Sequence, residues 1–238
     1  MRRRFAWVLA LVTVLLGSQP AAAEDAAGEI TLITGLATAV SLAGAMRELR
    51  RHDPIWPGDL IDAGPRCYLN IRFVDQSLLL LRPNSRLRVE RYRSPRAQLR
   101  STPAAAAPGE ARFRLLKGGL RAVSGAIAHM NRDRYRLITD VADIGVRGTD
   151  YFALRCGIDC AADARVRAAL PAGSEAARAL LAGVLQGAIV VQPRGGRAGV
   201  IDAGNRALIV AGRAPILLSG SPEFLDANPF PDPRSCLR

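Results

Sequence analysis

Turn signals that recur at short intervals are the feature that most constrains how this chain can fold. From residue 57 to residue 84 they occur about every ten residues, at Pro57-Gly58-Asp59, Gly64-Pro65, Asp75 and Pro83-Asn84. That rhythm is typical of an all-β sandwich, a jelly roll or a β-solenoid. Hydrophobic residues make up 49% of the chain and charged residues 23%, which is ordinary for a folded protein and too apolar for wholesale disorder.

The apolar residues between these turns alternate with a period of two. Residues 69–73 carry Leu, Ile and Phe at every second position, which fits a half-buried antiparallel strand. The leucines at 78–81 follow one another without interruption, and such a run predicts a strand buried on both faces. We therefore predict a single all-β domain over residues 24–220, with Gly-rich turns and little helix.

The rest of the chain continues this pattern, with three exceptions. Further strands are predicted at 112–116, 120–123, 135–138, 141–146, 184–191, 198–201 and 207–210. The low-complexity residues 101–110 predict a flexible loop. Residues 161–181 predict a helical insertion that includes Leu180 and Leu181, and the proline-rich residues 221–238 predict a tail that is an extended wrap or a loose end.

The N-terminus has the order of parts found in a secretory signal peptide. Arg2, Arg3 and Arg4 precede an apolar run over residues 5–16, and three alanines end at Ala23 before Glu24. The apolar run is about 12 residues, whereas a bilayer-spanning helix needs about 20. We expect residues 1–23 to be removed between Ala23 and Glu24, which places the mature chain in the periplasm or outside the cell. We expect no membrane span in the mature chain.

The four cysteines are interpreted as possible disulfides, because an oxidising compartment favours them. Cys156 and Cys160 are expected to form a short-loop disulfide, since their spacing is too wide for a thioredoxin-type motif. Cys67 and Cys236 could then pair and tie down the tail. Four cysteines permit three connectivities, and the sequence does not choose among them.

The charge is strongly basic, with 33 Lys and Arg against 21 Asp and Glu. Arginines crowd between residues 82 and 100, and on a strand Arg86 and Arg88 would lie on one face. Such a face could hold an anionic envelope polymer such as peptidoglycan or the phosphates of lipopolysaccharide, and a solvated face is the alternative. Aromatic residues are only 5%, so we expect no nucleic-acid partner.

Five motifs follow one another between residues 28 and 151, namely Gly28–Gly35, Trp56–Gly64, Leu69–Leu87, Phe113–Gly125 and Val141–Tyr151. Together they resemble the FecR domain family of bacterial envelope proteins. The family patterns GDxIxTG, LLKGxLRxVSG and VATIGVRGTD are similar to the second, fourth and fifth segments. Gln76 and Asp143 depart from the family, which usually has glycine and threonine at these positions.

The resemblance implies a function as well as a fold. The best-known members of the family regulate iron-citrate uptake and combine a cytoplasmic anti-sigma segment, a membrane helix and a periplasmic sensing part. The motifs in this chain resemble the sensing part without the other two. The resemblance therefore implies a receiving or adaptor module that engages an envelope protein, by strand addition or through a shallow face.

Residues 145–150 form the densest cluster of glycine and polar residues. Arg147 could clamp an anionic ligand, with Thr149 and Asp150 positioning it. The alternative is a tight inter-strand turn, in which Arg147 pairs with Asp150 or Asp143.

Nothing in the sequence points to catalysis or to a metal. His52 and His129 are the two histidines, and neither has a ligand at the spacing typical of zinc. No Gly-x-Ser-x-Gly motif is present, and nothing singles out a pair of acids. We expect no cofactor, no metal and no enzymatic activity, and a hydrolase is a third hypothesis without a motif.

Overall fold

The computed structural model describes residues 25–94, 109–130 and 132–236. The expected signal peptide, with its cleavage site, and most of the loop expected at 101–110 lie outside these residues. In chain order the elements are β1 (Gly28–Ile33), β2 (Ala37–Val40), β3 (Met46–Glu48), β4 (Pro54–Ile55), β5 (Leu60–Ala63), β6 (Leu69–Phe73), β7 (Leu78–Leu81), β8 (Ser85–Arg93), β9 (Glu110–Lys117), β10 (Gly119–Val123), α2 (Ala126–Met130), η1 (Arg132–Arg134), β11 (Tyr135–Ile138), β12 (Ala142–Arg155), α3 (Ile158–Ala162), α4 (Ala164–Ala169), η2 (Ala176–Arg178), β13 (Leu180–Pro193), β14 (Gly199–Asp202), β15 (Arg206–Ile209), β16 (Ile216–Leu217), α5 (Glu223–Ala227) and η3 (Pro233–Cys236).

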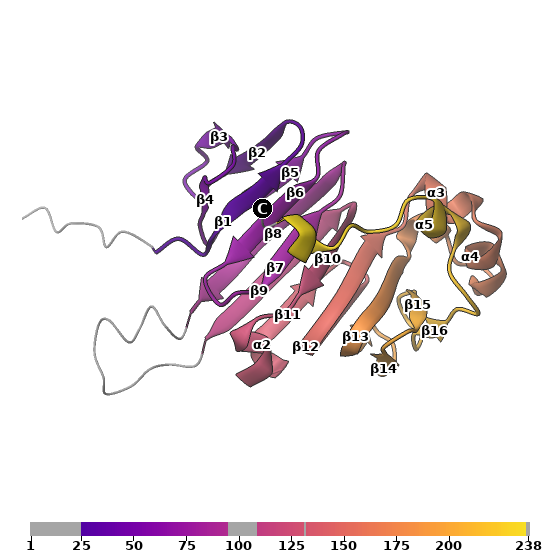
Figure 1. The fold of residues 1–238 in the computed structure, drawn as a ribbon. Helices are drawn as coiled ribbons and strands as arrows, with labels where there is room; N and C mark the ends of the chain where they lie inside the picture. Colours follow the sequence, from indigo (N-terminus) through magenta and orange to yellow (C-terminus); the bar gives the residue numbers. More distant parts are fainter. Residues whose placement is uncertain (1–24, 95–108, 131, 237–238) are drawn as a thin grey trace, which may run out of the picture.

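The strands form two layers that face each other (Figure 1). In the first layer the order is β3-β2-β5-β8-β9-β11, and in the second it is β10-β7-β6-β1-β4. β12 joins the layers, because residues 143–145 pair with β11 and residues 150–154 pair with β10. β13 pairs along β12, and it adds β14 to the first layer and β15 to the second. The all-β class predicted from the sequence is confirmed, and the architecture is a sandwich.

β12 is a long strand that folds over at its middle. Fourteen residues in a straight strand would span about 46 Å at about 3.3 Å per residue. Arg155, at the end of β12, nevertheless forms an ion pair with Asp140, which lies just before its start. At the bend Gly148 has a φ of +61°, and a Cβ on the neighbouring Gly187 would lie 2.5 Å from the carbonyl oxygen of Gly148. Glycine is therefore required where β12 and β13 turn together from one layer to the other.

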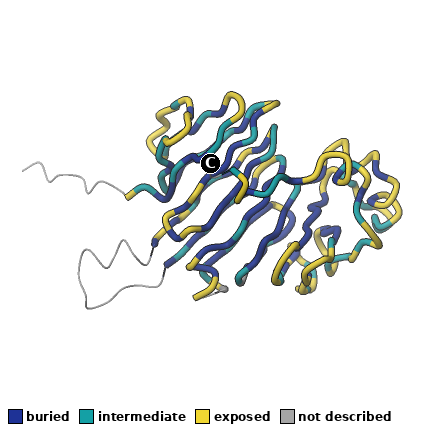
Figure 2. Tube along the Cα trace, viewed as in Figure 1, coloured by how far each residue is buried: buried dark blue, intermediate teal, exposed yellow. Residues whose placement is uncertain are grey.

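The hydrophobic core lies between the two layers. Ile144 and Tyr151, from opposite halves of β12, belong to the same buried cluster. The rings of Phe73, Phe113 and Tyr135 form a continuous series in this core, with centroids 5.1 Å and 5.7 Å apart. Figure 2 shows that buried residues run along the strands and that exposed residues gather in the connections.

The turn between β6 and β7 keeps a backbone conformation that glycine usually supplies. Gln76, at the position where the resemblance expects glycine, has a φ of +69°. The buried carboxylate of Asp75 holds this turn: it accepts hydrogen bonds from the N–H and hydroxyl of Ser77, at 3.0 and 2.6 Å, and from the hydroxyl of Tyr92, at 2.6 Å. The departure at position 76 therefore leaves the turn in the left-handed conformation.

The helical segments are short and lie mostly at one end of the sandwich (Figure 1). α3, α4 and η2 occupy much of the predicted helical insertion. The prediction is wrong for Leu180 and Leu181, which begin β13 and pair with β15. Both leucines are fully buried, so burial and strand pairing outweigh their helical spacing. No helix in the described ranges is long and apolar enough to cross a membrane.

β7 is buried on both faces, as the run of leucines predicts. Leu79 and Leu81 belong to the core between the layers. Leu78 and Leu80 point to the outer face of the second layer and are nevertheless buried. The C-terminal tail covers them, because it runs from α5 across this layer and η3 packs on β7 and β10 (Figure 1). The tail is thus a wrap and not a loose end, and it is extended only between its helical segments α5 and η3.

Candidate functional site

The predicted arginine face lies on the outside of the first layer. Arg86 and Arg88 occupy alternate positions of β8, as the period of two predicts. The Nε of Arg86 donates to the carboxylate of Asp62 on β5 at 2.7 Å, and Nη1 of Arg88 donates to the carbonyl of Gly58 at 3.3 Å. Both arginines therefore contact the protein's own acceptors.

Arginines also lie opposite one another on three neighbouring strands of this layer. The register places Arg88 opposite Arg114, and Arg112 opposite Arg136. We call these four residues the arginine ladder. Glu90 accepts hydrogen bonds from both Arg112 and Arg114. Since like charges directly opposite each other destabilise a sheet, the ladder is a place where a bound anion would relieve repulsion.

The motif at 145–150 forms the bend of β12. Thr149 is buried, its hydroxyl donates to the carbonyl of Ala188 at 2.8 Å, and its N–H donates to the hydroxyl of Ser124 at 2.7 Å. The backbone of Arg147 lies opposite Ala188, and its side chain is outside the described part of the chain. Thr149 thus holds the inter-strand turn together.

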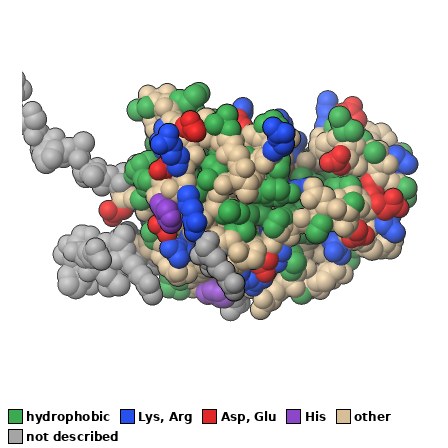
Figure 3. All heavy atoms as spheres, turned by 45° about the horizontal axis from the view of Figure 1, so that its top comes forward, with side chains coloured by type: hydrophobic (Ala, Val, Ile, Leu, Met, Phe, Trp, Pro, Cys, Tyr) green, Lys and Arg blue, Asp and Glu red, His purple; other side chains and the backbone are tan. Residues whose placement is uncertain are grey.

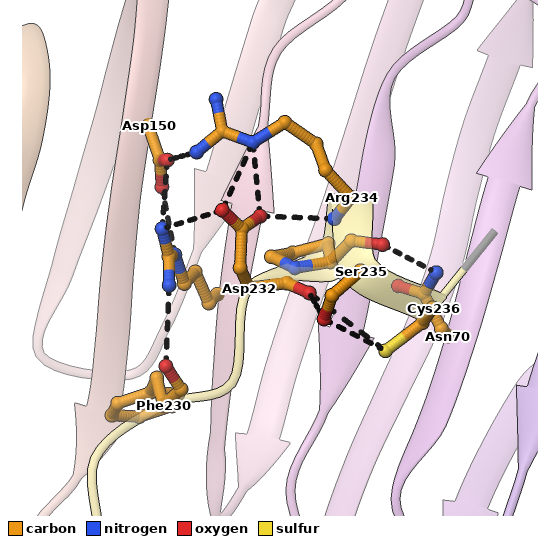
Figure 4. A network of polar contacts seen from close by, with 9 residues as sticks. Asn70, Asp150, Phe230, Asp232, Arg234, Ser235 and Cys236 are labelled. Atoms are coloured by element: carbon orange, nitrogen blue, oxygen red, sulfur yellow. Dashed lines mark hydrogen bonds and ion pairs between the residues drawn. The ribbon is translucent and has the colours of Figure 1, made fainter.

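The two carboxylates predicted as partners of the motif's arginine pair with other arginines. Asp143 accepts a hydrogen bond from Arg194 at 2.8 Å. Asp150 lies on the outer face of the second layer and binds Arg121 of β10 through both oxygens, each at 2.9 Å. Arg234 of the tail adds a third contact to Asp150, at 2.5 Å (Figure 4).

The pair of Arg121 and Asp150 is the centre of a buried polar network. Their side chains are 9% and 3% exposed. Arg121 also donates from Nη1 to the carbonyl of Phe230 at 3.2 Å, and its Nη2 lies 3.7 Å from Asp232. Arg234 in turn donates to both oxygens of Asp232, at 2.9 and 3.1 Å (Figure 4). Burial of charge is tolerated here because each charged group has a partner of opposite sign.

Four side chains line up beneath the tail, one from each of four neighbouring strands. The register places them side by side in the order Asn70, Leu80, Arg121 and Phe152. We call these four residues, together with Asp150, the cross-strand row. The tail follows this row, so it runs across the strands and does not extend the sheet. Nδ2 of Asn70 donates to the carbonyl of Pro233 at 3.1 Å.

An aromatic contact anchors the other end of the row. The ring of Phe230 stacks on that of Phe152, with centroids 4.9 Å apart, and the guanidinium of Arg82 lies 4.8 Å from the centre of the Phe230 ring. A hollow of 270 Å³ adjoins these rings and is also lined by Leu185 and Arg206. The row can therefore hold a ring, main-chain carbonyls and alternating charges of an extended polypeptide.

The charged side chains of the tail shift each other's pKa values. The hydrogen bond from Arg234 lowers the pKa of Asp232 below its ordinary value, and the nearby charge of Arg121 acts in the same direction. The same contact with Asp232 raises the pKa of Arg234. Both groups therefore stay ionised while the tail is in place.

The structure contains the disulfide between Cys156 and Cys160. The pairing suggested for Cys67 and Cys236 is wrong, because both are free. Cys67 lies in the core between the layers, whereas Cys236 lies in the tail, near Asn70 on the opposite side of the second layer (Figure 4). Burial raises the pKa of the Cys67 thiol, which makes it a poor nucleophile.

Sequence reasoning identified Asp150 but missed its partners. Asn70 and Arg121 lie on strands whose other outward residues did not indicate a covering segment. Asp232 and Arg234 lie in the tail, far from these strands in sequence. The available signal was the run of leucines in β7: its burial on both faces requires something to cover the outer face, and the proline-rich tail is a segment long enough to do so.

The histidines and acids of the described residues form no metal centre. His52 and His129 are both exposed, as expected of surface histidines. Within residues 25–94, 109–130 and 132–236, no three His, Cys, Asp or Glu side chains gather closely enough to hold a metal ion.

Comparison with protein-family models matches residues 59–190 to the model described as FecR protein. That segment is more than half of the 238 residues and contains three of the five motifs in full. Comparison with curated proteins finds no match.

Comparison with solved structures finds similarity to two kinds of protein. A cell surface anchoring domain is 32% identical over 26% of this chain and 82% of its own length, with a TM-score of 0.26. A candidate anti-sigma factor from Parabacteroides distasonis, represented by two crystal structures, is 10% identical, with a TM-score of 0.41. The match covers 63% of this chain and 54% of the anti-sigma factor, so the chain spans about half the length of that relative.

Proposed function

Because the chain belongs to the FecR family, we propose that it is a non-catalytic binding module in signal regulation that engages another protein of the cell envelope. We place it in the periplasm, because its N-terminus has the basic, apolar and small-residue regions of a signal peptide in the right order. The partner is expected to bind through a face of the sandwich that accepts polypeptide.

The cross-strand row is the observation that carries this proposal. Asn70 and Arg121 are polar side chains on the outer face of a sheet, and both donate hydrogen bonds to main-chain carbonyls of the tail. An aromatic-lined site is one recurring means of recognising an extended, proline-rich peptide, and the row offers such a site beside two side chains that donate to the main chain.

The buried carboxylates support binding in preference to acid–base catalysis. Asp59 accepts hydrogen bonds from Arg47, at 3.0 Å, and from the N–H of Trp56, at 2.9 Å. Asp75 holds the turn after β6, and Asp150 holds Arg121. Each of these carboxylates is used to join strands or turns.

A crosslinked pull-down of the tagged mature chain from its own envelope tests the proposal. We expect one protein that stays bound at high ionic strength, because a partly apolar protein interface resists salt. A chain with Arg86→Ser and Arg88→Ser is the control and should recover the same protein. Recovery of no protein, or recovery that disappears at high ionic strength, would refute a protein-binding role.

The compartment is tested separately. The full chain, expressed in its own host, should be recovered from the periplasmic fraction with Glu24 as its first residue. Recovery from the cytoplasm with the N-terminal arginines intact would contradict the periplasmic assignment.

The arginine ladder favours a second candidate function, direct binding of an anionic envelope polymer. Two adjoining hollows on this face, of 390 and 370 Å³, share Asp133 and Arg136, and the second is also lined by Arg112. Against it, Glu90 pairs with Arg112 and Arg114, and Asp62 pairs with Arg86, so the arginines of this face are not a field of one sign. Acidic and basic side chains are also mixed on the side of the molecule that Figure 3 shows.

Salt and mutation separate this second candidate from the first. Binding to purified peptidoglycan or lipopolysaccharide should fall steeply with ionic strength, and Arg86→Ser with Arg88→Ser should abolish it while the circular dichroism spectrum stays unchanged. Unchanged polymer binding by this variant would eliminate the arginine face.

A further inference from the structure

We propose that the cross-strand row is a binding site for an extended segment of a partner protein, and that the chain's own tail occupies it as a weaker, displaceable ligand. This inference rests on the proposed function, because it identifies the surface and the kind of segment that the module would bind. It follows from three features of the tail: an unsatisfied acceptor beneath it, its shallow attachment and its pattern of side chains.

The first feature is an acceptor that the tail leaves without a donor. Oδ1 of Asn70 is buried and accepts no hydrogen bond, although Nδ2 of the same side chain donates to Thr31, at 2.8 Å, and to the carbonyl of Pro233. The residue over Asn70 is a proline, which has a carbonyl but no N–H. An unsatisfied buried acceptor is costly, so a segment that supplies an N–H to Oδ1 of Asn70 would fit the row better than the tail does.

The second feature is the shallow attachment of the tail. Between residues 230 and 236 only Phe230 and Pro233 are buried. The side chains of Asp232 and Arg234 are 40% and 46% exposed, so their mutual ion pair is open to solvent and contributes little. The tail can therefore be displaced without disturbing the core between the layers.

The third feature is the order of the tail side chains that the row binds. Phe152 and Arg82 take an aromatic ring, Arg121 lies near a carboxylate two residues later, and Asp150 takes a cation two residues after that. The partner segment should carry the same order of aromatic, acidic and basic residues. It should differ from the tail in having a residue other than proline between the acid and the base.

Fluorescence anisotropy with a labelled peptide tests the inference. The probe has the sequence of residues 228–236, with Pro233→Ala to supply the missing N–H and Cys236→Ser to prevent disulfide formation. The protein is the full mature chain with Asp232→Ala and Arg234→Ala. These changes loosen the tail because they remove its contacts with Arg121 and Asp150, and they leave the residues of the row unchanged. We expect this variant to bind the peptide about tenfold or more tightly than the unchanged chain, because its row is less often occupied.

Two matched controls isolate the cause. The chain with Asp62→Ala and Arg86→Ala loses an ion pair of almost the same exposure, 38% and 49%, on the other layer, and it should bind no better than the unchanged chain. A peptide with N-methylalanine at the position of Pro233 has a methyl group in place of the N–H, as proline has a ring carbon, and it should bind about threefold or more weakly than the alanine peptide. Equal binding of the two peptides would overturn the role of Asn70.

The outcomes also separate this inference from the proposed function. No peptide binding by the loosened variant overturns the row as a docking site. If an envelope protein is still recovered in the pull-down, the module binds through another face and only the inference fails. If the unchanged chain forms dimers in light scattering and the loosened variant does not, the occupant is the tail of a second copy and the claim of a different partner is refuted.

Discussion

On the first layer Arg86 pairs with Asp62 at the surface, whereas on the second layer Arg121 pairs with Asp150 beneath the tail. The residue types and the two donating nitrogens are the same, but Arg86 reaches one oxygen of Asp62 and Arg121 reaches both oxygens of Asp150, and the tail covers only the second pair. A solvent-exposed pair contributes little to stability, but a buried charge must keep its partner. The tail, and not the sequence of the strands, therefore determines which of the two ion pairs contributes to stability.

Removal of one carboxylate from each pair should give the largest difference in stability between the two layers. We expect Asp150→Ala to lower the free energy of unfolding by about 3 kcal/mol, because it leaves the buried Arg121 guanidinium with only Asp232, which is 3.7 Å away and 40% exposed, as a counter-ion. The matched change Asp62→Ala should cost less than about 1 kcal/mol. Urea denaturation followed by circular dichroism measures both, and equal losses would show that the tail does not shield the second pair.

Loss of the aromatic anchor should produce the next largest effect. Phe230→Ala removes the ring that stacks on Phe152 and should destabilise the docked tail by roughly 1.5–3 kcal/mol, the usual value of a buried Phe side chain. Hydrogen exchange of the amides at 234–236 should rise accordingly. Exchange in β8 and β9 of the first layer serves as the control and should stay the same. Unchanged protection of the tail would mean that the polar network alone holds it.

The contrast between the layers also explains how far the sequence could predict this molecule. Strands 69–73 and 78–81 were predictable because a half-buried strand has a local period of two. The fold-over of β12 was not predictable. Gly148 indicates a turn both within one layer and between two layers, and only the pairing of β12 with distant strands shows that the chain changes layers. The helical insertion failed at Leu180 for the same reason, because its pairing with β15 is non-local.

In the candidate site, too, some residues could be predicted from the sequence and others could not. Asp150 was predictable as a functional or structural carboxylate from its glycine-rich surroundings. Its partner Arg234 lies 84 residues away in sequence, and Pro233 lies 163 residues from Asn70. Pairings at that distance depend on the path of the tail, which composition does not determine. The cysteine pairing failed likewise, because a strand separates the two thiols.

The disulfide between Cys156 and Cys160 stabilises the end of β12 that belongs to the second layer. A loop this short should contribute about 2 kcal/mol through the entropy of the unfolded chain. We expect Cys156→Ser with Cys160→Ser to lower stability by that amount in urea denaturation. Alkylation of the unreduced, denatured protein should add two groups, on Cys67 and Cys236. A mass with no added groups would show that these two cysteines pair after all.

Acid should weaken the attachment of the tail to the second layer. The pKa of Asp232 is lowered in the folded chain, chiefly by the hydrogen bond from Arg234 and further by Arg121. Its stabilising contribution is therefore present above the ordinary value of 3.8 and is lost as the pH falls through the lowered pKa. Asp150, which faces both arginines, remains as a second carboxylate at the same place, so the effect is the smallest of the four.

Hydrogen exchange at pH values above and below 3.8, corrected for intrinsic rates, measures this release. We expect protection at 234–236 to fall on acidification while protection in β8 and β9 is kept. In Asp232→Asn, which cannot titrate, protection of the tail should be lower at the higher pH and should change less on acidification. The same pH response in both proteins would show that Asp232 is not the source of the effect, and the tail would then not depend on its own exposed carboxylate.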